Sequence, residues 1–218
     1  MKFRGVIFDL DGTLINSIDD LADSMNSILR KHNFPIHDRF TYEGFIGHGI
    51  KNLVKKSLPE SYRDEQKCLK YFYMMMDEYS KNCTKKSKPY NGISELLHRL
   101  ISNNIKIAVL SNKADNLTKK TVLTLLPDWD FEFIVGFTTE ENRKPNPLVA
   151  LQISKGMGID PCDIAFVGDS GIDMQTANNA GMYSVGVLWG FRSEEELVSN
   201  GAKHLISHPL ELMEFYSL

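Results

Sequence analysis

Cysteine is scarce in this sequence, and long apolar runs are absent. The three cysteines, Cys68, Cys83 and Cys162, are too few for a disulfide framework and form no CxxC pair, so we expect reduced thiols. No segment approaches the roughly 18 consecutive apolar residues of a membrane-spanning helix. The first residues contain acids and no long apolar stretch, which does not fit a signal peptide. These absences predict a cytoplasmic protein that does not enter a membrane.

An excess of positive charge is also missing. Lys and Arg total 25 against 28 for Asp and Glu, which gives a net charge of −3. Proteins that hold a nucleic-acid duplex need many basic contacts to phosphates, so we do not expect nucleic acid as a partner. The apolar share of 42% is that of an ordinary folded chain. At about 150 residues per domain, 218 residues allow one or two domains.

Short apolar strands alternate with helical patterns along most of the chain. The strands are predicted at residues 3–10, 105–110, 131–136, 164–167, 183–187 and 204–206. Such alternation implies right-handed crossovers and a parallel sheet. The sequence therefore predicts an α/β fold with a Rossmann-like parallel sheet.

Residues 17–87 interrupt this alternation with helical patterns alone. One predicted helix carries an apolar stripe at Leu21, Met25, Ile28 and Leu29, and Ser17 with Asp20 resembles its N-terminal cap. A second stripe, at Leu69, Phe72, Tyr73 and Met76, is predicted to face the helical core. We expect a core domain of residues 1–16 and 88–218, with a helical domain of residues 17–87 inserted after the first strand.

Polar residues that could do chemistry follow several of the predicted strands. Asp9 and Asp11 follow the first strand, Ser111 and Asn112 another, and Asp169 with Asp173 a third, while Lys144 lies in a loop. In an open α/β sheet, ligands bind beyond the carboxyl ends of the strands, so these residues are expected to converge.

The four acids would repel one another unless a cation joined them. Oxygen ligands favour Mg²⁺, whereas Zn²⁺ would call for His or Cys. Lys144 offers a positive charge for phosphate, and Ser111 offers a hydroxyl. Gly12 allows the chain to turn close to a ligand, and the Asn112 backbone N–H is a further candidate donor.

Four segments then resemble the motifs of one family in the family's own order. DLDGT at 9–13, SN at 111–112, KPNP at 144–147 and GDSGID at 168–173 resemble those of the haloacid dehalogenase-like phosphohydrolase superfamily. The insertion lies where that family carries a helical cap. Segments 45–54 (FIGHGIKNLV) and 185–197 (VGVLWGFRSEEEL) are similar to segments of its phosphoglycolate phosphatases.

The resemblance implies a role for each motif residue. Asp9 would be the nucleophile that forms an aspartyl-phosphate, and Asp11 the general acid and base. Residues i and i+2 leave a strand on the same face, which would allow both to reach the phosphoryl group. Ser111 would bind a phosphate oxygen and Lys144 would offset charge. Mg²⁺ is implied at Asp9, at the Asp11 carbonyl and at Asp169, with Asp173 orienting metal waters or Lys144.

The implied activity is hydrolysis of a small phosphorylated metabolite, with 2-phosphoglycolate favoured. Pyrophosphate, sugar phosphates and β-phosphoglucomutase chemistry remain alternatives within the family. His48 in the segment 47–52 is a candidate for substrate binding, as is Arg192, and the role of Lys51 stays open. The sequence leaves open whether the protein is a monomer or a homodimer.

Three other interpretations fit less well. Gly168-Asp169-Ser170-Gly171 resembles the nucleophile segment of serine hydrolases, but those folds would need another strand pattern. A receiver-type signalling module would place its acceptor Asp after the third strand and has no insertion. A binding protein on an inactive scaffold is disfavoured because Asp9 and Asp11 are both present.

Overall fold

The computed structural model describes residues 3–46 and 49–216. The chain divides into two compact units. Unit 1 comprises Met1–Asn16 and Pro89–Leu218, and unit 2 comprises Ser17–Lys88. A two-stranded sheet pairs β2 (Ile15–Asn16) with β3 (Lys88–Pro89), where the chain leaves and re-enters unit 1. No described helix is both long enough and apolar enough to cross a membrane.

Unit 1 is built on a six-stranded sheet with the order β5-β4-β1-β6-β7-β8. The strands are β1 (Gly5–Phe8), β4 (Lys106–Ala114), β5 (Phe133–Phe137), β6 (Ile164–Gly168), β7 (Tyr183–Val187) and β8 (His204–Ile206). Every pair of neighbours is parallel. The predicted parallel α/β sheet is therefore confirmed.

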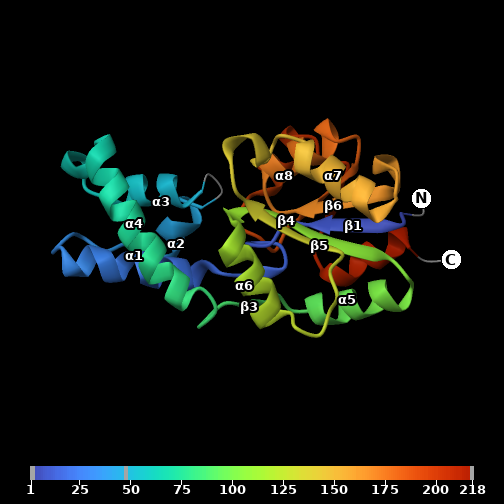
Figure 1. The fold of residues 1–218 in the computed structure, drawn as a ribbon, viewed down its shortest axis with the longest axis horizontal. Helices are drawn as coiled ribbons and strands as arrows, with labels where there is room; N and C mark the ends of the chain where they lie inside the picture. The colour runs from blue at the N-terminus through green and yellow to red at the C-terminus, as the bar shows by residue number, and fades with distance from the viewer. Residues whose placement is uncertain (1–2, 47–48, 217–218) are drawn as a thin grey trace. The chain divides into compact units, whose positions relative to one another are not determined.

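Helices cover both faces of this sheet, as Figure 1 shows for α7 and α8 above it and α5 below it. The helices of unit 1 are α5 (Ile93–Ser102), α6 (Asp115–Leu125), α7 (Leu148–Met157), α8 (Gly171–Asn179) and α9 (Glu194–Ser199), with short 3₁₀ turns at Glu140–Asn142, Pro161–Asp163 and Pro209–Phe215. Val6 and Phe8 pack into the core on the α5 side, and Ile7 packs into the core on the α7 side. Alternate side chains leave a strand on opposite faces, so β1 is apolar throughout because it is buried on both.

Two strands, β1 and β4, differ most in length from the sequence prediction. β1 ends at Phe8, so Asp9 lies beyond the strand. β4 runs on through Ser111 and Asn112 to Ala114, with an irregularity in its pairing to β5 after Leu110. The polar residues after Leu110 continue the strand because neighbouring β5 still pairs at Ala114.

Unit 2 is helical. It contains α1 (Ile18–Lys31), α2 (Arg39–Glu43), α3 (Ile50–Ser57), α4 (Glu65–Asn82) and a 3₁₀ turn at Glu60–Tyr62. Helix α4 packs against α1 and α3, and α1 packs against α2. The predicted stripe of α1 is confirmed, because Leu21, Met25, Ile28 and Leu29 are all buried.

The predicted core stripe of α4 is wrong. Leu69 and Tyr73 are exposed, and the half-buried Phe72 and Met76 flank them. The buried residues are instead Cys68, Tyr71, Met75 and Tyr79. The segment is apolar over two adjacent faces, so spacing alone could not identify the face that packs against α1 and α3.

Ser17 is the N-cap residue of α1, as predicted, but its side chain makes no capping hydrogen bond. Asp20 has another partner. Its buried carboxylate accepts hydrogen bonds from Lys86 N at 2.9 Å, Ser87 N at 2.8 Å and Ser87 Oγ at 2.6 Å. Asp20 therefore ties the end of unit 2 to its first helix.

Candidate active site

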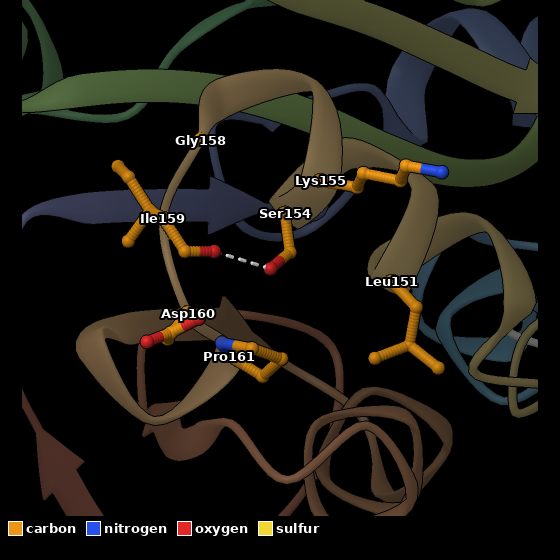
Figure 2. A pocket seen from close by; sticks show the side chains of 7 residues that line it. All are labelled: Leu151, Ser154, Lys155, Gly158, Ile159, Asp160 and Pro161. Atoms are coloured by element: carbon orange, nitrogen blue, oxygen red, sulfur yellow. Dashed lines mark hydrogen bonds between the residues drawn. The ribbon is translucent and has the colours of Figure 1, made fainter.

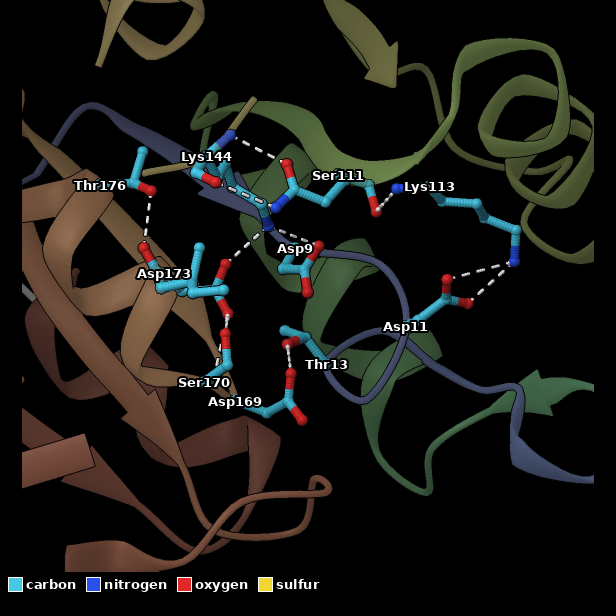
Figure 3. A network of polar contacts seen from close by, with 12 residues as sticks. Asp9, Asp11, Thr13, Ser111, Lys113, Lys144, Asp169, Ser170, Asp173 and Thr176 are labelled. Atoms are coloured by element: carbon cyan, nitrogen blue, oxygen red, sulfur yellow. Dashed lines mark hydrogen bonds and ion pairs between the residues drawn. The ribbon is translucent and has the colours of Figure 1, made fainter. Parts of the chain in front are cut away.

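The motif residues of unit 1 meet at the carboxyl end of the three central strands. Asp9 directly follows β1, Asp169 directly follows β6, and Ser111 lies in the second half of β4. Lys144 comes from the loop before α7 and Asp173 from the first turn of α8. The sheet order β4-β1-β6 brings these chain segments together, as Figure 3 shows. This is the edge at which open α/β sheets bind ligands.

Lys144 joins two of the acids. Its Nζ lies 2.8 Å from Asp9 Oδ1 and 2.6 Å from Asp173 Oδ1. Lys144 and Asp173 are buried, with exposed fractions of 4% and 0%. Asn112 holds the lysine backbone from β4, since its Oδ1 accepts from Lys144 N at 2.9 Å and its Nδ2 donates to Lys144 O at 3.1 Å. The Asn112 side chain therefore positions Lys144, a role that the sequence analysis did not foresee.

Burial dominates the electrostatics of these groups. Burial raises the pKa of Asp9 to about 7, although the nearby Lys144 ammonium opposes this shift. Burial also raises the pKa of Asp169 well above its usual range, and the charges of Asp173 and Asp9 add to the effect. Burial would lower the pKa of Lys144, but the carboxylates of Asp173 and Asp9 outweigh it and raise that pKa. The lysine is therefore charged, and the acids gain from an added cation.

Asp169 is held by two segments of unit 1. Its Oδ2 accepts a hydrogen bond from Phe191 N at 2.8 Å, and its Oδ1 accepts one from Thr13 Oγ1 at 3.4 Å. Trp189 Nε1 in turn donates to the Thr13 carbonyl at 3.0 Å. The loop after β7 and the loop after β1 thus fix this carboxylate from two sides.

Two glycines allow these loops to approach Asp169. A Cβ atom at Gly12 would lie 2.3 Å from Asp169 Oδ2, and one at Gly190 would lie 2.2 Å from Asp169 Cβ. Gly12 also has a φ of +90°, which side chains rarely adopt. Gly12 therefore lies close to a side chain of the protein itself, and its predicted approach to a ligand stays a prediction.

Asp11 and Ser111 lie near a lysine that the sequence analysis did not single out. Lys113 Nζ is 2.9 Å from Asp11 Oδ1 and 3.2 Å from Asp11 Oδ2. The backbone N–H of Lys113 donates to Ser111 Oγ at 3.3 Å. In Figure 3 the Asp11 carboxylate points toward Lys113, away from Asp9. The strand-face reasoning for Asp9 and Asp11 does not hold, because β1 ends before both residues.

Asp173 is engaged at both carboxylate oxygens. One contacts Lys144, and the other accepts hydrogen bonds from Ser170 N at 3.1 Å and Ser170 Oγ at 2.5 Å. Together with the Asp173 backbone these bonds form a capping box at the start of α8. Asp173 thus caps the N-terminus of α8 and forms an ion pair with Lys144. Its oxygens are less available to a metal than those of Asp9 and Asp169.

The described acids fit a divalent cation. Asp9, Asp169 and Asp173 each offer an oxygen, and these oxygens lie within 4.8 Å of one another. The group contains no His or Cys, which suits Mg²⁺ rather than Zn²⁺. With Asp11, the candidate site holds four carboxyl groups and the two ammonium groups of Lys113 and Lys144, so its formal charge with every group ionised is −2. A divalent cation would neutralise it.

Three further candidates from the sequence are His48, Lys51 and Arg192. His48 lies outside the described residues. Arg192 Nε lies 3.6 Å from Glu196 Oε2, and Lys51 is an exposed residue of α3 in unit 2. Lys113 could have been identified from the sequence, because it directly follows the Ser111-Asn112 pair. Thr13 lies in the motif at 9–13 and Phe191 in the segment 185–197, but the sequence does not show that the Thr13 hydroxyl and the Phe191 backbone N–H both contact Asp169.

A hollow elsewhere on unit 1 lacks such chemistry. It is lined by Leu151, Ser154, Lys155, Gly158, Ile159, Asp160 and Pro161. Figure 2 shows Ser154 turned to the Ile159 carbonyl, to which its hydroxyl donates. The hollow contains one acid and no group of convergent polar side chains. The strand-end cluster is therefore the candidate active site.

Comparison with known proteins agrees with this location. The family described as haloacid dehalogenase-like hydrolase matches residues 6–187. Phosphoglycolate phosphatase from Aquifex aeolicus is 31% identical over 97% of this chain and 95% of its own length. N-acetylmuramic acid 6-phosphate phosphatase from Pseudomonas putida is 27% identical over the same two shares. The crystal structure of a candidate phosphoglycolate phosphatase from Lactobacillus delbrueckii matches with a TM-score of 0.91 and 27% identity, covering 99% of both chains.

Proposed function

Since the chain belongs to the haloacid dehalogenase-like hydrolase family, we propose that it is a cytoplasmic, Mg²⁺-dependent phosphatase of a small phosphorylated metabolite. The proposal rests above all on the Asp9–Lys144–Asp173 chain of ion pairs beside Asp169. A nucleophilic carboxylate paired to a buried lysine can accept a phosphoryl group without a build-up of negative charge.

The reaction takes two steps. An Asp9 oxygen attacks phosphorus and the ester P–O bond breaks, which leaves an aspartyl-phosphate on Asp9. The departing oxygen takes a proton from Asp11, which enters this step as the neutral carboxylic acid and leaves it as the carboxylate. The Asp11 carboxylate then accepts a proton from water, the water oxygen attacks phosphorus, and the bond to Asp9 breaks to release phosphate. Lys144 and Ser111 hold the phosphoryl oxygens through both steps.

Asp9, the Asp11 carbonyl and Asp169 would hold the Mg²⁺ ion. When bound, the ion offsets charge on the phosphoryl oxygens and on the nucleophile. Asp173 is assigned to Lys144 rather than to the ion, because Lys144 and Ser170 already occupy its two oxygens. Unit 2, predicted at residues 17–87, is assigned as the cap that excludes water from the aspartyl-phosphate during its formation.

The favoured substrate is 2-phosphoglycolate, on the strength of the relative from Aquifex aeolicus. The relative from Pseudomonas putida makes N-acetylmuramic acid 6-phosphate a second candidate. Both compounds are acids that carry a carboxylate in addition to the phosphate. Pyrophosphate and hexose phosphates complete the set of compounds to compare.

A kinetic screen tests the proposal. We expect Mg²⁺ to support release of phosphate from 2-phosphoglycolate at the highest kcat/KM of the set. EDTA should abolish turnover, and added Mg²⁺ should restore it. Asp9→Asn should fold but retain less than about a thousandth of the activity, whereas the matched change Asp128→Asn at an exposed site should have no effect. Full activity in EDTA would refute the metal assignment, and an active Asp9→Asn enzyme would refute the nucleophile.

A further inference from the structure

Lys113 is a second lysine of the site, and neither the family motifs quoted above nor the proposed reaction steps use it. Its side chain is 2% exposed, and that of its partner Asp11 is 16% exposed. The ammonium contacts both oxygens of Asp11, so the two groups form a two-pronged ion pair. Lys113 thus ranks with Lys144 as a buried cation of the candidate site.

Stability is a weak explanation for this pair. A buried ion pair loses about as much in desolvation as it gains from charge attraction, and apolar replacements are often as stable. The pair also occupies the carboxylate that must reach the departing oxygen. As long as both Asp11 oxygens face Lys113, Asp11 cannot be aimed at the substrate.

We propose that Lys113 is the receptor for a second acidic group of the substrate, and that this group replaces Asp11 as its partner. The inference rests on the proposed phosphatase function and adds the class of substrate to it. The substrates selected are phosphomonoesters with a carboxylate close to the phosphorylated oxygen. The exchange of partners releases the Asp11 carboxylate at the moment when a correct substrate is bound.

The arrangement of the charges supports this assignment. Lys144 and Asp173 lie on one side of Asp9, while Asp11 and Lys113 lie on the other, as Figure 3 shows. When an Asp9 oxygen attacks phosphorus in line, the departing oxygen lies on the far side of the phosphoryl group, and the general acid Asp11 has to reach it there. In 2-phosphoglycolate one CH₂ group separates that oxygen from the carboxylate, which brings the carboxylate within reach of an ammonium adjoining Asp11.

Two substrates of similar length and with the same phosphate ester bond distinguish the effect of the acidic group on binding from the reactivity of the ester. 2-Phosphoglycolate carries a carboxylate where 2-hydroxyethyl phosphate carries a neutral hydroxyl group. We expect the wild type to prefer the acid in kcat/KM. In Lys113→Met the ratio of the two kcat/KM values should fall by about 10- to 100-fold, the usual cost of a lost charged hydrogen bond. Lys113→Arg, which retains the charge, should recover part of the ratio.

The controls distinguish this inference from a structural role. Lys119→Met removes an exposed lysine of α6 and should leave the ratio unchanged. If Lys113 only supported the fold, Lys113→Met would slow both substrates by the same factor, and an unchanged ratio would overturn the inference. A wild type that hydrolyses both compounds equally well would also overturn it, without recourse to any variant. If the wild type with Mg²⁺ hydrolyses another phosphate ester of the comparison set but neither of these two compounds, the inference fails while the proposed phosphatase function stands. Hydrolysis of no compound of the set refutes the proposed function as well.

Discussion

The contact between Gly190 and Asp169 leads to the sharpest structural prediction. A Cβ atom at residue 190 would lie 2.2 Å from Asp169 Cβ and 2.6 Å from its Oδ2. Carbon atoms pack at about 3.5–4.0 Å, so Gly190→Ala must separate the two segments by about 1.3 Å. Gly190 does not have a positive φ. The substitution therefore acts through this contact and not through backbone strain.

Such a displacement would disable the proposed metal ligand. The Phe191 N–Asp169 Oδ2 hydrogen bond, 2.8 Å long, would stretch beyond hydrogen-bond range. Loss of a group that orients a ligand typically weakens metal binding by about 10- to 100-fold. We therefore expect Gly190→Ala to raise the Kd for Mg²⁺ by that factor. Its kcat/KM at saturating Mg²⁺ should fall by about 100-fold, as misplacement by about 1 Å can cause.

Calorimetric titration of the substrate-free protein with Mg²⁺ measures the first effect directly. Trp189→Phe removes the N–H that contacts the Thr13 carbonyl, together with part of the ring, and should weaken binding in the same direction but less. Gly44→Ala is the matched control, because a Cβ there meets only an ordinary contact at 3.5 Å. A folded Gly190→Ala protein that binds Mg²⁺ within about twofold of the wild type would refute the role assigned to Asp169 and its loop.

Three further predictions concern stability. Lys144→Met leaves Asp9 and Asp173 buried without their cationic partner, and it should lower the free energy of unfolding, measured in urea, by about 3–5 kcal/mol. A change below about 1 kcal/mol would contradict the ion pairs. Burial raises the pKa of Asp9 to about 7 and also raises the pKa of Asp169, so the folded metal-free protein binds more protons than the unfolded chain. The free energy of unfolding in EDTA should therefore fall as the pH rises from about 4 to 7. The fall should be at most about 1.4 kcal/mol per pH unit for each group. Thermal melts at several pH values with EDTA and with Mg²⁺ check this prediction. A stability in EDTA that rises over this pH range would contradict it. Asp20→Asn should destabilise the protein by about 1.5–3 kcal/mol in a urea titration, because an amide cannot accept all the hydrogen bonds from Ser87 and its neighbour.

Local patterns predicted the fold well where burial is unambiguous. β1 is buried on both faces and therefore reads as a continuous apolar run. The stripe of α1 was also correct, since only one face of that helix is apolar. The predicted buried face of α4 was wrong because the apolar residues of this helix span two faces. Only the packing against α1 and α3 decides that Tyr71 is buried and Tyr73 is exposed.

By itself the sequence determined the fold class and the family. Both depend on features that lie close together in the chain, namely strand runs and motifs of two to six residues. Only the tertiary structure decided which charges pair. Lys113 meets Asp11 across 102 residues and Lys144 meets Asp173 across 29. Four acids and two lysines compete for partners at the end of the sheet. Differences of about an ångström decide the competition, because charge attraction and hydrogen bonding in a buried site depend steeply on distance.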